Sequence, residues 1–145
     1  MERRQALKRL AAVPAAATVF CWTAEEAQAA AQQAQQARAQ AVAAGTPYAP
    51  KFFTRHEYAT VVLLSDMILP KDARSVSASA AGAPEFIDYI IAEQKERQTA
   101  LRGGLSWLDA ESVKRFDKTF VACTDANRRA VLDDIAYPKR AKPEF

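Results

Sequence analysis

The feature that most constrains the fold is an apolar segment bounded by a helix-start motif and a proline. Thr54 and Glu57 have the spacing of a capping box, in which each side chain accepts a backbone N–H of the first helical turn. The apolar run VVLLSDMIL follows, and Pro70 ends it because proline cannot continue a helix. The apolar side chains are Tyr58, Val61, Val62, Leu64, Met67, Ile68 and Leu69. A helix with so wide an apolar surface is predicted to lie in the centre of a core.

A second helix is predicted after a polar loop of about a dozen residues. Pro84 suits the first helical turn, and Glu85 is favourable near the positive end of the helix. Its buried face is expected to comprise Phe86, Ile87, Ile90 and Ile91. The pair Gly103 and Gly104 is predicted to end this helix.

Two shorter helices complete the predicted fold. Ser106 or Asp109 is expected to cap the third, and Thr124 to cap the fourth. Apolar side chains recur at helical spacing at Val113, Phe116, Phe120 and Cys123, and again at Val131, Leu132 and Ile135. No segment shows the alternation of a half-buried strand. The sequence therefore predicts an all-α fold, a small bundle of about four short helices over residues 51–138.

The first 29 residues have the layout of an export signal. A cationic zone comes first, the apolar run LAAVPAAATVFCW follows, and the polar TAEEAQA comes after it. The apolar run is shorter than the roughly 20 residues that span a bilayer, so a permanent anchor is not expected. Ala27-Gln28-Ala29 offers small residues at which a signal peptidase cuts. We predict that residues 1–29 are a signal peptide.

The cationic zone carries a paired arginine. Arg3 and Arg4, followed by Leu7 and Lys8, resemble the twin-arginine export motif. The residues at positions 2 and 6 depart from the usual pattern, so a general secretory route stays open, and the remaining alternative is an ordinary basic helix. The motif favours a periplasmic protein exported in the folded state by the twin-arginine route.

The spacer after this leader is biased toward alanine and glutamine. Residues 30–50 have good helix propensity but almost no apolar stripe, which predicts a frayed helix or a flexible connection. Loss of the leader would remove Cys21, leaving Cys123 without an internal disulfide partner. Cys123 is therefore expected to be a buried apolar residue.

The motifs of several function classes are missing from the sequence. The formal charge of +3 is accounted for by residues 1–9, so the rest lacks the basic face that nucleic-acid binding needs. No CxxCH haem site, dinucleotide glycine motif or zinc-ligand spacing occurs. The single histidine, His56, is expected at the surface of a capped helix start. A further alternative is a small hydrolase that uses two carboxylates as general acid and base. The candidates are Asp66, Asp72, Asp88, Asp133 and Asp134, but most of them are expected to be helix-surface or capping residues.

From Phe52 to Pro138 the chain resembles the small-subunit family of gluconate 2-dehydrogenase, often called subunit 3. The resemblance rests on FFTRHEYATVVLLSDMILPKD, GAPEFIDYII, GLSWLDAESVKRFDKTF and VLDDIAYP, in that order. It implies a non-catalytic subunit that escorts and stabilises a flavoprotein during export. Family members continue past the last motif with an aromatic-rich segment, so residues 139–145, KRAKPEF, are interpreted as a basic tail that is possibly truncated.

The resemblance also implies the partners. They are an FAD-dependent large subunit of the glucose–methanol–choline type and a multihaem c-type cytochrome, so FAD and haem are expected on other chains and no cofactor on this one. The alternative is a free-standing exported helical module that binds another protein or a small ligand.

Four residues are candidates for the partner interface. Phe52 and Phe53 follow Pro50 and point in different directions at a helix start, so at least one is expected to lack a place in the core. Trp107 either contacts the partner subunit or packs at the edge of this chain's own core. Asp66 interrupts the apolar run, and it faces either solvent or a cation of the partner.

Replacing both Arg3 and Arg4 by lysine tests the export route. Because the twin-arginine machinery requires the arginine pair, we expect the double variant to lose export of a fused reporter to the periplasm. Undiminished export of the variant would show that the chain uses a different route.

Overall fold

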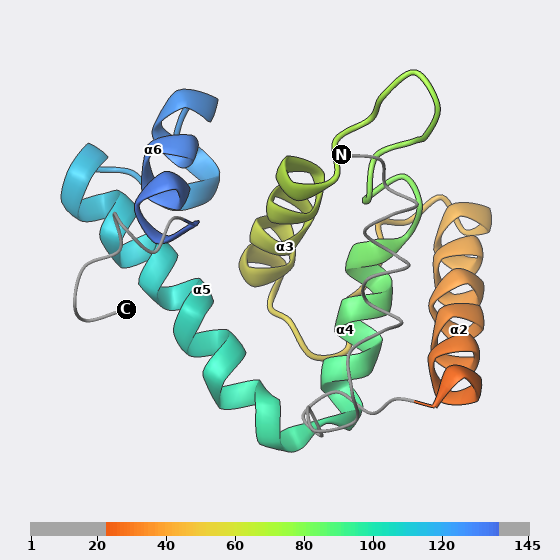
Figure 1. Cartoon of the computed structure of the whole chain (residues 1–145). Helices are drawn as coiled ribbons and strands as arrows, with labels where there is room; N and C mark the ends of the chain where they lie inside the picture. The colour runs from red at the N-terminus through yellow and green to blue at the C-terminus, as the bar shows by residue number, and fades with distance from the viewer. Residues whose placement is uncertain (1–22, 137–145) are drawn as a thin grey trace, which may run out of the picture.

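The computed structural model describes residues 23–136, and within that range the secondary structure is helical (Figure 1). The order is α2 (Ala24–Ala43), α3 (Arg55–Ile68), α4 (Ala83–Glu93), α5 (Lys95–Phe116), the 3-10 helix η1 (Phe120–Ala122) and α6 (Asp125–Ala136). The all-α prediction is confirmed. The export motif, Cys21 and the tail at 139–145 lie outside the described residues.

Helix α2 replaces the frayed spacer that was expected. Thr23 and Glu26 form a capping box that starts it, and the helix continues for 20 residues, so the cap and residues 24–29 of the helix overlap the end of the predicted signal peptide. It lies along α4, and the methyl groups of Ala30 and Ala34 are buried (Figure 1). The absence of a wide apolar stripe did not prevent docking, because two small side chains let the helix approach α4 closely.

Helix α3 begins as predicted. The Thr54 side chain accepts the Glu57 N–H, and the Glu57 carboxylate accepts the Thr54 N–H. Its first three turns pack against α4 and α5, with Val61 and Ser65 buried. In its last turn Met67 packs against the Leu108, Phe120 and Val131 side chains, but Ile68 is 73% exposed, so the expectation that Ile68 fills the core was wrong.

Helix α5 runs without a break through Gly103 and Gly104, which were predicted to end the preceding helix. Helix α4 instead ends at Glu93. Glycine lowers helix propensity, but Leu105 and Leu108 are buried on the same side of α5 and hold that part of the chain in helical conformation. Packing overrides local propensity here.

The C-terminal part differs from the expected third helix. Asp117 adopts φ 55°, a left-handed conformation that ends α5 at Phe116. The chain then reverses, and Phe120 enters the core from the 3-10 helix. Cys123 is buried as predicted, although it follows the 3-10 helix instead of lying in a longer helix. Val113 is exposed, which contradicts its expected inward position.

Helix α6 starts where the sequence indicated. The Asn127 N–H donates to the Thr124 hydroxyl, and the Arg128 N–H donates to the Thr124 carbonyl. Val131 is fully buried and Leu132 packs partly against the same core, as expected. Ile135, which was also expected to face inward, is exposed.

The core consists of two small clusters that share one side chain. The first contains Phe53, Val61 and Leu105, and the second contains Leu108, Phe120 and Val131. Leu64 packs against both. Helices α3 and α5 therefore connect the two clusters.

None of the helices in residues 23–136 has the length and apolar character that crossing a membrane requires.

Substituting Gly103 and Gly104 by alanine, singly, should stabilise the domain. A Cβ at either position would meet nothing within 4 Å, and each change should raise the free energy of unfolding by about 0.5–1 kcal/mol. Urea unfolding followed by circular dichroism measures this change.

Gly82 to alanine is the matched control. Gly82 has φ 88°, and a Cβ there would lie 3.4 Å from Arg38 Nη1, so this change should destabilise the chain. Stabilisation at Gly82, or loss of stability at both helical glycines, would contradict the analysis of α5.

Candidate partner interface

A buried carboxylate on α4 holds the segment that leads into α3. Asp88 is fully buried and accepts four hydrogen bonds, from the Tyr48 hydroxyl at 3.0 Å and from the backbone N–H groups of Lys51, Phe52 and Phe53 at 2.7, 3.0 and 3.0 Å. Asp88 was expected at a helix surface or cap, and this was wrong because its donors lie 35 to 40 residues earlier in the chain. The carboxylate fixes the direction in which the adjacent phenylalanines leave the backbone.

Two tyrosines line the space next to this carboxylate. The Tyr48 and Tyr58 rings lie 5.4 Å apart, beside an open groove of about 800 Å³ between residues 46–50 and the start of α3. Burial, followed by the Asp88 charge, raises the pKa of Tyr48, and burial, followed by the Glu85 charge, raises the pKa of Tyr58. Both phenols therefore stay protonated at neutral pH and remain hydrogen-bond donors.

The two candidate phenylalanines have different environments. Phe53 is 4% exposed and belongs to the first core cluster, so its place among the interface candidates is not supported by its geometry. Phe52 is half-buried, and its ring contacts the Arg102 guanidinium at 4.4 Å. Arg102 also donates to the Phe52 carbonyl and pairs with Glu57. The expectation that at least one phenylalanine lacks a full place in the core therefore applies to Phe52.

Asp66 has a role inside the chain. Its carboxylate accepts the Ser79 N–H at 2.8 Å and the Ser79 hydroxyl at 2.6 Å, which ties the loop after α3 back to that helix. These hydrogen bonds lower the pKa of Asp66. The sequence offered solvent or a partner's cation as its environment, whereas the structure supplies Ser79.

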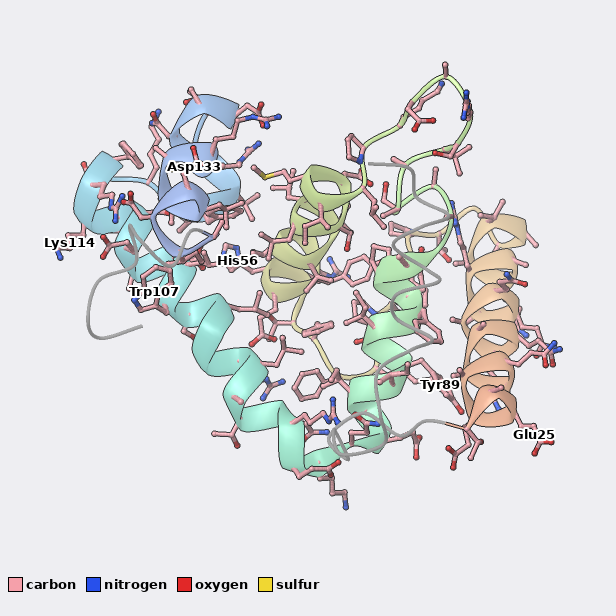
Figure 2. All side chains as sticks on the ribbon, viewed as in Figure 1. Glu25, His56, Tyr89, Trp107, Lys114 and Asp133 are labelled. Atoms are coloured by element: carbon pink, nitrogen blue, oxygen red, sulfur yellow. The ribbon has the colours of Figure 1, made fainter. Side chains whose placement is uncertain are left out.

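Trp107 lies on α5, away from the other candidates. It is half-buried and packs against the second core cluster together with Phe116 (Figure 2). The structure does not bring Trp107, Asp66 and Phe52 into one surface, because they belong to the second cluster, the end of α3 and the first cluster respectively.

The most exposed apolar side chains near the core were missed as interface candidates. We define the α3-end patch as Ile68, Leu69 and Val76, which are 73%, 56% and 57% exposed. The patch is held in place because the Ala78 N–H donates to the Leu69 carbonyl at 3.0 Å and Asp66 binds Ser79. The sequence did indicate it indirectly, since an apolar run continued to the proline that ends the helix.

His56 is exposed, as predicted. Its Nε2 is hydrogen-bonded to Asp109, whose other carboxylate oxygen accepts the Phe120 N–H at 2.9 Å. This pair joins α3, α5 and η1. Within residues 23–136, no group of three or more His, Cys, Asp or Glu side chains is placed to hold a metal ion.

The structure defines a small all-helical domain with large exposed apolar side chains at the end of α3. The family model for gluconate 2-dehydrogenase subunit 3 matches residues 55–145, and the chain belongs to that family. The family name identifies a subunit of a multi-subunit oxidoreductase. Searches of curated proteins and of solved structures found no match.

Replacing Asp88 by alanine should destabilise the domain strongly. Four donors would lose their acceptor, three of them backbone N–H groups next to the core, so we expect a loss of about 3 kcal/mol or more in the free energy of unfolding. Urea titration of the purified chain measures the loss. Asp133→Ala, at an exposed position of α6, is the control and should change little; equal effects of the two substitutions would refute the anchoring role of Asp88.

Proposed function

We propose that this chain is the non-catalytic small subunit of a periplasmic, FAD-dependent dehydrogenase complex of the sugar or gluconate type. In this role it binds the flavoprotein subunit, stabilises it and accompanies it during export. The observation that carries the proposal is the family match over residues 55–145, which covers α3 to α6.

The division of labour between subunits supports this role. The sequence of this chain has a stretch that resembles the twin-arginine export motif, but no dinucleotide glycine motif and no haem attachment motif. The proposed partner is a flavoprotein of the glucose–methanol–choline type that lacks its own signal peptide, with a multihaem c-type cytochrome as a further subunit. The twin-arginine route would export the small and large subunits together after folding.

The α3-end patch is the proposed contact surface for the flavoprotein. Large apolar side chains that stay exposed on an ordered surface are typical of protein interfaces, and truncating an anchor residue there commonly costs 2 kcal/mol or more of binding. The patch projects beyond both core clusters, so a partner can cover it without disturbing the helices.

Co-expression with a candidate flavoprotein of the glucose–methanol–choline type tests the function. A tagged small subunit recovered from the periplasm should bring with it a yellow protein that oxidises a sugar or sugar acid, because the partner carries the flavin. Recovery of a colourless small subunit alone, with the flavoprotein folded and exported without it, would refute the proposal.

Ile68→Asp should weaken binding of the flavoprotein by at least about tenfold, because it places a charge in an apolar contact. Val113→Asp is the control, since Val113 is also an exposed apolar residue, at 45%, in the last turn of a helix, and it lies on α5, away from both the α3-end patch and α2. Binding is measured by biolayer interferometry, and thermal melting confirms that both variants fold. Equal effects of the two substitutions would place the interface elsewhere.

A further inference from the structure

Helix α2 lies before the region that defines the family. The family match begins at residue 55, at the start of α3, whereas α2 spans Ala24–Ala43. In this chain α2 nevertheless covers one side of α4 (Figure 1). The covered side of α4 lies within the matched region, whereas α2, which covers it, lies before that region.

The contact between α2 and α4 extends along both helices but buries little apolar side-chain surface. The buried residues of α2 are Ala30 and Ala34, and alanine side chains remove little apolar surface from water. The polar part of the contact comes from Arg38, which donates to the Ala80 carbonyl at 2.8 Å and lies 3.7 Å from the Glu85 carboxylate. The Arg38 side chain is 37% exposed, so its ion pair is screened by solvent.

The side of α4 beneath α2 contains an unsatisfied acceptor. Glu85 is 7% exposed, and its Oε2 atom has no hydrogen-bond partner among the described residues. Burial, followed by the Glu85 charge and the approach of the Tyr58 hydroxyl to Glu85, raises the pKa of Tyr58, but no donor makes a well-formed hydrogen bond to Oε2. A buried carboxylate oxygen without a donor is costly, so a state in which a cation reaches this oxygen is favoured electrostatically.

The connection after α2 permits movement without unfolding the domain. The Gly45 and Thr46 N–H groups donate to the Val42 and Ala41 carbonyls and end α2, with Gly45 at φ 65°. The chain from residue 48 to residue 53 is held by four hydrogen bonds to Asp88. Movement of α2 can therefore pivot between residues 46 and 48 while the start of α3 stays fixed.

We propose that α2 is a detachable strap, and that a cationic segment of the flavoprotein subunit displaces it from α4 and pairs with Glu85. This inference rests on the proposed function for the identity of the occupant. In the closed state Arg38 occupies the place of the partner's cation. It pairs with Oε1 of the Glu85 carboxylate and leaves Oε2 without a donor. The partner's arginine or lysine supplies the donor that Oε2 lacks.

Substituting each partner of the Arg38–Glu85 ion pair distinguishes a detachable α2 from an α2 that is a fixed part of the domain. Arg38→Ala removes the group that holds α2 closed and leaves the Glu85 site intact. Glu85→Gln also loosens α2, but it removes the charge that the partner recognises. Arg129→Ala is the control, because Arg129 forms an exposed ion pair with Asp125 on α6, away from α2.

Hydrogen–deuterium exchange on the purified chain gives the first measurement. Both Arg38→Ala and Glu85→Gln should speed exchange in residues 30–43, the part of α2 that follows the predicted signal peptide, by roughly tenfold, with exchange in α3 to α6 unchanged. Arg129→Ala should leave α2 as it is. If α2 exchanges as slowly after Arg38→Ala as in the wild type, it is a fixed part of the domain and the strap is refuted.

Affinity for the purified flavoprotein gives the second measurement. Arg38→Ala should bind roughly threefold or more tightly, because a larger fraction of the chain is open. Glu85→Gln should bind about tenfold more weakly. A change in the same direction for both variants would refute docking on α4. Failure of the wild type to bind would refute the proposed function and the docking step with it, while hydrogen exchange would still decide whether α2 detaches.

Discussion

The hydrogen bonds accepted by the Asp88 carboxylate are the interaction on which the rest of the domain depends. They gather a tyrosine hydroxyl and three consecutive backbone N–H groups around one buried charge. This arrangement satisfies a carboxylate that would otherwise be very costly to bury. It also fixes the chain just before the capping box of α3. Phe53 is thereby directed into the first core cluster and Phe52 toward Arg102 at the surface.

Features of the fold that depend on residues close together in the sequence could be predicted. The helix starts at Thr54 and Thr124 follow from side chains that bond three residues ahead. Interactions between distant segments could not be predicted in this way. Asp88 resembled any polar residue of a helix surface, because its partners lie on a segment that precedes it by 35 residues or more. Gly103 and Gly104 predicted a helix end because glycine has a low helix propensity. Local propensity does not include the packing of Leu105 and Leu108, which holds α5 in helical conformation.

The candidate interface was predictable only in part. Aromatic residues beside a proline drew attention to Phe52 and Phe53, but residue type alone could not separate the half-buried Phe52 from the buried Phe53. The exposure of Ile68 depends on where the core ends relative to α3, and that position is set by packing with α4 and α5. Because the chain belongs to a family of dehydrogenase subunits, we propose the exposed apolar surface as a contact for another subunit.

The division of the core into two clusters has a consequence for how the domain loses its structure. Each cluster contains three buried side chains, and Leu64 is the residue that packs against both. Each cluster alone buries little apolar surface, so each half depends on the contact with the other for much of its stability. If the contact at Leu64 is weakened, the end of α5, the 3-10 helix and α6 form a unit that can open while α3 and α4 stay packed. The domain then has a partly open form whose exposed apolar surface, lined by Phe120 and Val131, would be a ready substrate for proteases and for aggregation.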